Sequence, residues 1–331
     1  MPEGHSIHRI AIQFRHNFVG HRIAASSPQG RFADGAAQLD GRTMLGATAV
    51  GKQLFLEFEG DRFLRVHLGL YGAWDFAGQI SADATIASSN GRMGQTNQRG
   101  TLLEEYGERT PLDFGGSIGA PRRLRMAEQE KEETLDSFPP DPVGAVRVRL
   151  LTETAVADLR GPTACEVLDP QQVKAVLAKL GPDPLVDDGP EAEERFVRAV
   201  RRTTKPIGLL LMDQSVVSGI GNVYRAELLF RARLDPHTPG REVPEDTVRA
   251  LWRDWARLLE LGVRTGQMMT KDDLTEKEWS KAMADQQERH YVYKRHGLPS
   301  PRGDGNVVIE DMGGRNLYWA PGWQIRPGTG A

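Results

Sequence analysis

The chain has 331 residues, which exceeds one typical domain and predicts two or three compact units. Hydrophobic residues make up 39% and charged residues 26%, and no apolar run approaches the roughly 20 residues that span a bilayer, so the composition excludes a disordered chain and a membrane protein. The net charge of −3 argues mildly against nucleic acid as a partner, although positive charge can still be concentrated locally.

The first half of the chain predicts a helix followed by a β-rich unit. The N-terminus is polar where a signal peptide would be apolar, so we expect a cytoplasmic protein. Residues 2–19 have apolar side chains at helical spacing and predict an amphipathic helix. Short alternating runs over 22–76, separated by glycines, predict strands. Residues 82–145 are rich in polar and charged side chains, and we expect a long, largely flexible insertion, after which two strands return at 145–152 and 154–159.

The second half predicts an all-α domain and a small β-hairpin module. Helical spacing recurs in five stretches: 170–180, 190–204, 206–212, 221–232 and 244–265. From Arg289 to Gln324 apolar and aromatic residues alternate with turn residues, which favours a hairpin. We therefore expect three domains, with boundaries at 1–165, 166–285 and 286–331.

The N-terminus offers a possible nucleophile. Removal of Met1 would leave Pro2 with a secondary α-amine, and a neutral α-amine can attack a sugar C1′ to form a Schiff base. Glu3, the next residue, could serve as the acid or base. Taken alone, the pair is more typical of an ordinary helix start, with proline at the first position and an acid that complements the helix dipole.

Two glycine-bounded turns carry further candidates. Lys52 follows Gly51 at the head of a strand, where a lysine can reach a phosphate or can simply be solvated. In the turn after His67, the exposed side chains of Leu70 and Tyr71 would suit insertion between DNA bases, whereas the alternative is that both point into the core.

The segment from Lys205 to Glu227 combines an apolar helix, a turn ending in Gly219-Ile-Gly221, and a new helix that opens with Asn222. Glycines before a helix N-terminus allow backbone N–H groups to meet a phosphate. Basic residues outnumber acidic ones around this segment, which favours local DNA binding. A packed helical hairpin with a solvated basic face is the alternative.

Taken in order, six motifs resemble the formamidopyrimidine-DNA glycosylase and endonuclease VIII family, and somewhat more closely the endonuclease VIII branch. They are Pro2-Glu3-Gly4, Gly51-Lys52, His67-x-x-Leu70-Tyr71-Gly72, Leu180-Gly-Pro-Asp-Pro-Leu185, Asp213-Gln214 with Gly219-Ile-Gly-Asn222, and the tail with Gly314-Arg315. The resemblance covers nearly the whole chain apart from the insertion. It implies an α+β multidomain fold with an N-terminal helix and antiparallel β-sandwich, an all-α helix–two-turn–helix domain and a C-terminal β-hairpin finger.

The resemblance also implies a role for each candidate residue. Pro2 would be the Schiff-base nucleophile, Glu3 the proton donor in base release, Lys52 the proton donor for β-elimination, and Arg315 a phosphate clamp associated with δ-elimination. Among the DNA contacts, His67 and Asn222 would hold phosphates, and Gly69, Leu70 and Tyr71 would fill the void left by a flipped base. Lys179 matches a basic DNA-contact position, and Arg160 matches a strand-separating arginine of the purine-repair branch.

The tail departs from the family at its zinc finger. Where the family has four cysteines this chain has Ser300, Gly303, Ala320 and Trp323. Because Cys165 is the only cysteine, and its ordinary interpretation is a small buried hydrophobe, a thiolate zinc site is excluded. We expect no metal and no other cofactor, and a finger held by packing of its aromatic residues.

The sequence thus predicts a bifunctional DNA glycosylase and abasic-site lyase of base excision repair that removes oxidised bases, pyrimidines in preference. Its partner would be double-stranded DNA containing damaged bases or abasic sites, and we expect a monomer associated with the nucleoid. Two alternatives stay open: an oxidised-purine glycosylase, and a non-catalytic binder of damaged DNA. Retention of Pro2, Glu3 and Lys52 argues against the binder, which has no need of a terminal secondary amine.

Overall fold

A computed structural model describes residues 2–81, 92–94, 111–113, 116–119, 138–187 and 189–328. The chain divides into two compact units, the first formed by residues 1–178 with 263–267 and the second by 179–262 with 268–331. Within the described residues, no helix is long and apolar enough to cross a membrane. The three expected domains, with their boundaries near 165 and 285, stay a prediction.

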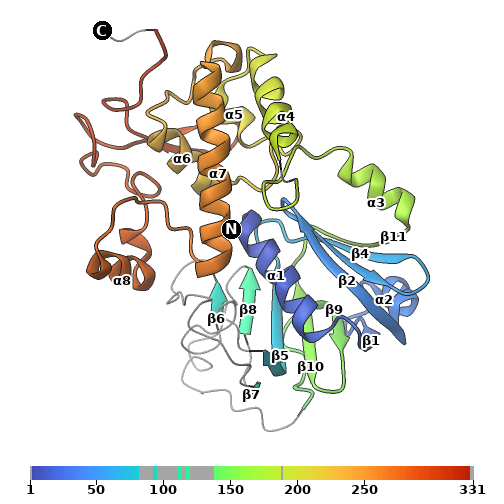
Figure 1. Cartoon of the computed structure of the whole chain (residues 1–331). Coiled ribbons are helices and arrows are strands. Elements are labelled where there is room, and N and C mark those ends of the chain that lie inside the picture. Colours follow the sequence, from blue (N-terminus) through green and yellow to red (C-terminus); the bar gives the residue numbers. More distant parts are fainter. Residues whose placement is uncertain are drawn as a thin grey trace. The chain divides into compact units, whose positions relative to one another are not determined.

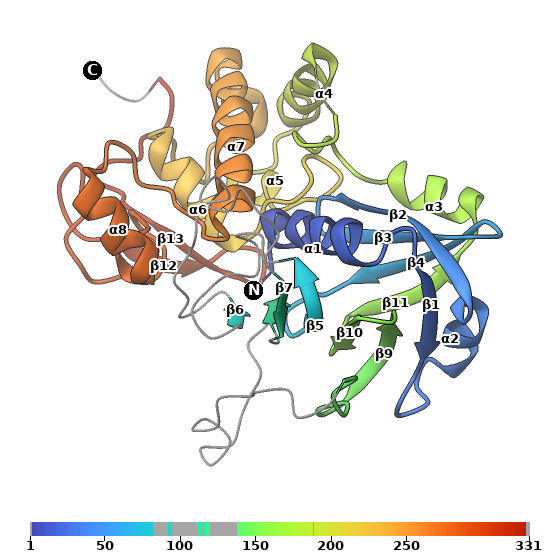
Figure 2. The ribbon, with the colours of Figure 1, turned by 60° about the horizontal axis from the view of Figure 1, so that its bottom comes forward.

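The first unit is a mostly antiparallel sheet with helices packed on it (Figures 1 and 2). Its elements are α1 (Gly4–Asn17), β1 (Arg22–Ser26), α2 (Ala33–Leu39), β2 (Arg42–Val50), β3 (Gln53–Phe58), β4 (Arg62–His67), β5 (Ala73–Ser81), β6 (Arg92–Gly94), β7 (Pro111–Asp113), β8 (Gly116–Gly119), β9 (Val146–Leu151), β10 (Ala155–Arg160), β11 (Ala164–Leu168) and α3 (Pro170–Leu177).

The strand order is β11-β4-β3-β2-β1-β9-β10-β5-β8-β6, with β7 also paired to β5. Strand β1 joins the two halves of the sheet. Its first two residues, Arg22 and Ile23, pair with β2, and its last three, from Ala24 to Ser26, pair with β9. A strand that changes partners in this way lets one sheet fold into the two layers of a sandwich.

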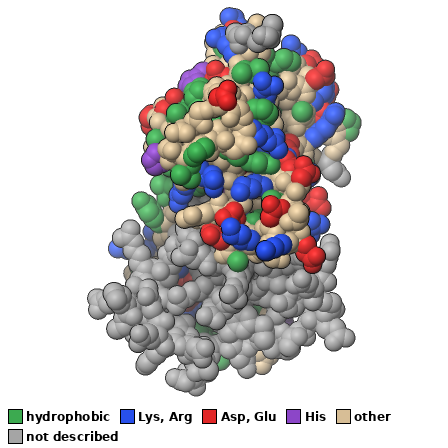
Figure 3. Space-filling model, turned by 90° about the vertical axis from the view of Figure 1, so that its left-hand side faces the viewer, with side chains coloured by type: hydrophobic (Ala, Val, Ile, Leu, Met, Phe, Trp, Pro, Cys, Tyr) green, Lys and Arg blue, Asp and Glu red, His purple; other side chains and the backbone are tan. Residues whose placement is uncertain are grey.

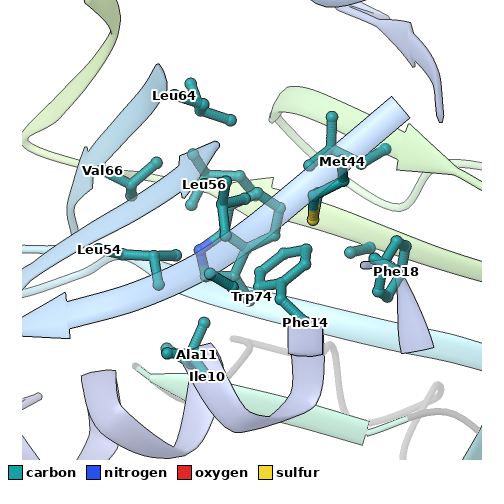
Figure 4. Close-up of a cluster of buried hydrophobic side chains, with 14 of the residues drawn as sticks. Ile10, Ala11, Phe14, Phe18, Met44, Leu54, Leu56, Leu64, Val66 and Trp74 are labelled. Carbon is teal, nitrogen blue, oxygen red and sulfur yellow. The ribbon is translucent and has the colours of Figure 1, made fainter. Parts of the chain in front are cut away.

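The core of this unit lies between the strands and α1. Figure 4 shows Trp74 from β5 among aliphatic side chains from β3 and β4, with Phe14 from α1 against it. The ring centroids of Phe14 and Trp74 are 4.9 Å apart and the rings meet edge to face, a favourable aromatic geometry. Cys165, which is half-buried, packs against the same core, and burial raises the pKa of its thiol to about 12, which disfavours the reactive thiolate.

Three short strands fall inside the stretch that the sequence predicts to be an insertion. Strands β7 and β8 pair antiparallel with β5, and β6 pairs parallel with β8. Strands β7 and β8 cover an edge of β5 that would otherwise present unpaired backbone groups. The other residues of 82–137 lie outside the described part of the chain.

The second unit is helical and ends in a hairpin. Its elements are α4 (Pro190–Arg201), α5 (Ile207–Leu210), α6 (Asn222–Arg231), η3 (Gly240–Glu242), α7 (Glu245–Thr265, whose last residues group with the first unit), α8 (Glu276–Ala284), η4 (Gln286–Glu288), β12 (Val308–Asp311) and β13 (Asn316–Trp319). Apolar side chains of α4 to α7 form its main core. A separate cluster packs the end of α6 against residues 291–320, where the hairpin lies.

Candidate active site

Pro2 and Glu3 are both buried at the head of α1, where Glu3 is the N-cap residue and its carbonyl accepts the Ser6 N–H at 3.0 Å. His5 follows in the first turn. Burial, followed by the nearby charge of Arg9, lowers the pKa of His5 to about 3, so its imidazole is neutral at physiological pH. The head of the helix therefore gains no positive charge from His5.

Lys52 and His67 are brought together by the β2–β3 turn. Gly51 and Lys52 form a two-residue hairpin turn, and Gly51 has the positive φ, 58°, that the first position of such a turn requires. The next residue, Gln53, pairs with His67 of β4. The Lys52 carbonyl lies 3.0 Å from His67 Nδ1. Since a carbonyl can only accept, Nδ1 carries the proton, and Nε2 of a neutral His67 has only a lone pair. Burial, the largest cause, lowers the pKa of His67.

The turn that contains Leu70 and Tyr71 places both side chains in solvent, with 43% and 74% of their surface exposed. Of the two possibilities left open by the sequence, the structure therefore selects exposure over burial in the core. Its glycines are required by close packing, because a Cβ on Gly69 would lie 1.8 Å from Thr163 Oγ1 and one on Gly72 would lie 2.4 Å from the Leu68 carbonyl. Gly69 also has a φ of 66°.

Arg160 ends β10 opposite Ala73, and its guanidinium forms an ion pair with Asp75 of β5 through two hydrogen bonds. Both side chains are largely buried. This partner could not be found from the sequence, because nothing in the local pattern distinguishes Asp75 from a solvated strand residue. The Arg160 guanidinium is thus engaged in an ion pair between neighbouring strands of the sheet.

The Gly219-Ile-Gly221 turn of the second unit is held from two sides. Gln214 donates to the Ile220 carbonyl at 3.0 Å and accepts the Gly219 N–H at 3.0 Å. The Leu-Gly-Pro-Asp motif packs against the same turn, since Gly181 N–H donates to the Gln214 carbonyl and Ser218 Oγ donates to the Gly181 carbonyl. These hydrogen bonds show that the Leu-Gly-Pro-Asp motif and the Gly219-Ile-Gly221 motif support each other. Lys179, directly before Leu180, is exposed.

Asn222, the first residue of α6, is buried and donates its side-chain amide to the Asn316 carbonyl at 2.7 Å. Asn316 starts β13, directly after Arg315, which is exposed in the turn between β12 and β13. The Arg315 carbonyl accepts the Met312 N–H, and Gly313 and Gly314 both take positive φ values. The structure thus joins two predicted site residues of the second unit, Asn222 and Arg315, through the hairpin.

Two functional candidates on α6 were missed by sequence reasoning. Arg225 is fully buried and donates to the carbonyls of Met312 and Asn316. Glu227, also fully buried, accepts the backbone N–H groups of residues 291, 292 and 293. In the sequence both lie within the charged segment from Lys205 to Glu227, and no local signal shows that their partners lie more than 60 residues away.

The finger lacks the four cysteines that form the family's zinc site. Ser300, Gly303, Ala320 and Trp323 occupy the four positions, and among the described residues no group of three His, Cys, Asp or Glu side chains could hold a metal. Packing and hydrogen bonds connect the finger to the rest of its unit instead. The Trp323 ring lies 6.1 Å from that of Phe230, donates its N–H to the Phe230 carbonyl at 2.9 Å, and has the Arg233 guanidinium 4.8 Å from its centre. Such cation–π and aromatic contacts can replace the folding energy of a metal.

We expect elemental analysis of the purified protein to find no stoichiometric zinc, because the residues at these four positions supply no thiolate. A strong chelator should leave both the melting temperature and strand cleavage unchanged. The comparison is a cysteine-containing member of the family treated in parallel. One tightly bound zinc per chain, removed with a fall in melting temperature, would contradict this prediction.

The charge pattern of the surface is mixed. Figure 3 shows lysine and arginine side chains interspersed with acidic ones over the described part of one face. Several basic residues around the segment from Lys205 to Glu227 are held in ion pairs, such as Arg201 with Glu245 and Arg231 with Asp254 and Asp272. Part of the positive charge counted in the sequence is therefore neutralised within the protein and is not available for contact with DNA.

Comparison with known proteins identifies the family. The model of the formamidopyrimidine-DNA glycosylase N-terminal domain matches residues 1–102, and that of the formamidopyrimidine-DNA glycosylase H2TH domain matches residues 180–273. The chain is 35% identical over 321 residues to endonuclease 8 1 of Mycobacterium tuberculosis, covering 97% of this chain and 98% of that protein. It is also 35% identical over 146 residues to the formamidopyrimidine-DNA glycosylase of Thermus thermophilus, covering 44% of this chain and 54% of that protein.

Solved structures share the fold. The MutM (Fpg) protein of Thermus thermophilus superposes with a TM-score of 0.63 at 22% identity, covering 98% of both chains. Fpg of Lactococcus lactis, solved with DNA containing N7-benzyl-Fapy-dG, gives a TM-score of 0.67 at 18% identity and covers 98% of this chain and 99% of that one. The fold class and the family expected from the sequence are confirmed. The chain belongs to the formamidopyrimidine-DNA glycosylase and endonuclease VIII family and is a DNA glycosylase of base excision repair.

Proposed function

We propose that this enzyme is bifunctional, removing an oxidised base and then cutting the strand through a Schiff base on Pro2. The observation that carries the proposal is the position of Pro2 and Glu3, which are both buried at the N-terminal end of α1. Burial and the positive end of a helix dipole both disfavour an ammonium group, so a secondary amine placed there is more readily nucleophilic.

In the proposed reaction the Pro2 nitrogen bonds to C1′ of the flipped nucleotide, and the base leaves with a proton supplied by Glu3. The attached nitrogen then loses its proton and the C1′–O4′ bond breaks, with O4′ taking up a proton, so that the sugar ring opens and an iminium forms. The iminium withdraws electrons from the opened sugar. Loss of a C2′ proton then expels the 3′ phosphate, with Lys52 as the proton donor, and a second elimination expels the 5′ phosphate with Arg315 holding it. All groups in this sequence belong to the chain, and no cofactor takes part.

The proposed partner is double-stranded DNA that contains a damaged base or an abasic site. Fpg of Lactococcus lactis has been solved in complex with DNA containing an abasic site, which supports this choice. Asn222, Lys179 and His67 would contact phosphates, His67 as a donor only when protonated, since Nδ1 already serves the Lys52 carbonyl. We propose that the enzyme acts as a monomer on the DNA of the nucleoid.

Oxidised pyrimidines are the proposed substrates. Leu70 and Tyr71, which resemble the void-filling residues of the pyrimidine-repair branch, are exposed, whereas Arg160, the candidate from the purine-repair branch, is paired with Asp75. An apolar and an aromatic side chain can enter the base stack without losing an ion pair. These two observations favour pyrimidine repair over the oxidised-purine alternative, which rests on likeness to formamidopyrimidine-DNA glycosylases. The non-catalytic alternative is disfavoured because the relatives are named as enzymes.

We expect thymine glycol and 5-hydroxyuracil to be excised faster than 8-oxoguanine opposite cytosine. The measurement is single-turnover excision from matched duplexes that differ only in the lesion, with borohydride added in parallel reactions to trap the covalent complex. Tyr71→Ala should slow excision from all of them, because every flipped base leaves a void. Faster excision of 8-oxoguanine would favour the purine alternative.

A further inference from the structure

The turn that carries Arg315 has little stability of its own. Strands β12 and β13 have four residues each, and an isolated two-stranded hairpin is marginal in water. Gly313 and Gly314 occupy the turn with φ values of 67° and 73°, a conformation that glycine adopts at a high entropic cost. Something outside the hairpin must hold this turn if Arg315 is to meet a phosphate in a fixed geometry.

Arg225 of α6 makes that connection. Its Nη1 donates to the Met312 carbonyl at 3.3 Å and its Nη2 to the Asn316 carbonyl at 3.3 Å, so one guanidinium contacts both residues that flank the turn. Hydrogen bonds from a charged donor are stronger than neutral ones, and the planar guanidinium holds two acceptors in a fixed geometry. The side chain is fully buried and therefore lies beneath the hairpin rather than on the surface.

Asn222 completes the arrangement one helical turn earlier. Its Oδ1 accepts from Arg225 Nη2 at 2.5 Å, and its Nδ2 donates to the same Asn316 carbonyl at 2.7 Å. An amide NH₂ has two hydrogens, so this bond uses one of them. The proposed phosphate contact of Asn222 and the turn of Arg315 are thus linked through a single carbonyl.

We propose that Arg225 is a positioning residue that fixes the Arg315 turn relative to Asn222, so that two phosphate contacts are preorganised as one unit. This inference rests on the proposed function, in which Arg315 clamps a phosphate. Arg225 touches neither DNA nor the reacting atoms in this role. By holding the glycine turn in one conformation before DNA binds, Arg225 reduces the conformational entropy that the turn loses on binding.

A double-mutant cycle tests the proposal. Arg225→Gln, Arg315→Ala and the double variant are measured for binding to a duplex with a tetrahydrofuran abasic analogue, and for the ratio of δ- to β-elimination products on a true abasic site. Arg253→Gln is the control for charge, since Arg253 is 69% exposed on α7 and pairs with Glu193. Hydrogen exchange of the 308–319 peptide reports on the hairpin directly.

We expect Arg225→Gln to weaken binding about tenfold, as for one lost hydrogen bond to a charged group, and to lower the δ-to-β ratio. In the Arg315→Ala background the same change should have less than about a twofold further effect, because both residues act through one turn. Exchange within 308–319 should rise in Arg225→Gln but stay unchanged in Arg253→Gln.

Two outcomes would overturn the role of Arg225 and leave the Arg315 clamp standing. In one, the losses in binding affinity caused by the two substitutions multiply in the double variant. In the other, Arg225→Gln binds DNA and exchanges hydrogen as the wild type does. An Arg315→Ala variant as active as wild type would overturn both. Should Arg225→Gln fail to fold, Arg225→Lys keeps the charge but cannot reach both carbonyls. It is expected to show the same loss of δ-product, and wild-type behaviour in that variant would refute the inference.

Discussion

Replacing Pro2 with glycine is expected to lower the yield of borohydride-trapped enzyme on abasic DNA by on the order of a hundredfold. A secondary amine gives an iminium that is permanently charged, whereas the primary amine of glycine gives an imine that must first be protonated. The glycine amine also loses the ring that fixes its direction at the head of α1. The measurement is the covalent complex resolved by gel electrophoresis after a short exposure to borohydride.

Glu3→Gln is the matched variant for the Pro2 experiment. It should block removal of an intact damaged base, because the amide cannot supply the proton, yet it should still trap on DNA whose base has already been removed. Unchanged melting temperatures would show that both variants fold. An undiminished yield in Pro2→Gly would place the nucleophile elsewhere, with Lys52 the next residue to test.

Arg315→Ala is expected to weaken binding to abasic-site DNA by about tenfold or more and to remove most of the δ-elimination product. An arginine at a hairpin tip can hold a phosphate through two parallel charge-assisted hydrogen bonds, and alanine supplies neither. The slope of log K against log salt should fall by about one unit, as for the loss of one phosphate contact. The same titrations with Arg253→Gln should retain the wild-type slope.

The Arg315→Ala experiment also tests whether a finger without the family's cysteines still contacts DNA. Because packing of Phe230, Tyr291 and Trp323 holds the hairpin in place of the family's four cysteines, a strong effect of Arg315→Ala would show that the phosphate contact survives the change in how the finger is built. Full activity of the variant would show that the tail no longer contacts DNA.

Local sequence was sufficient for the regular elements with strong periodicity. The expected helices over 170–180, 190–204, 221–232 and 244–265 appear as α3, α4, α6 and α7, and the expected strands at 145–152 and 154–159 appear as β9 and β10. Helical or alternating apolar spacing is a property of neighbouring residues, so it can be seen without the fold. Helix α8 was missed although Thr275 and Glu278 form a capping box before it, a signal that could have been recognised.

The candidate site was located by motifs, but the partners of its residues were decided by the tertiary structure. Residues 291–293 were expected in a hairpin, yet their N–H groups bond to the Glu227 carboxylate instead of another strand. Likewise Asp75 was not expected beside Arg160, nor Arg225 beneath the turn of Arg315. A buried polar group must be paired, and which distant residue pairs with it depends on how the chain folds back on itself, which local spacing does not specify.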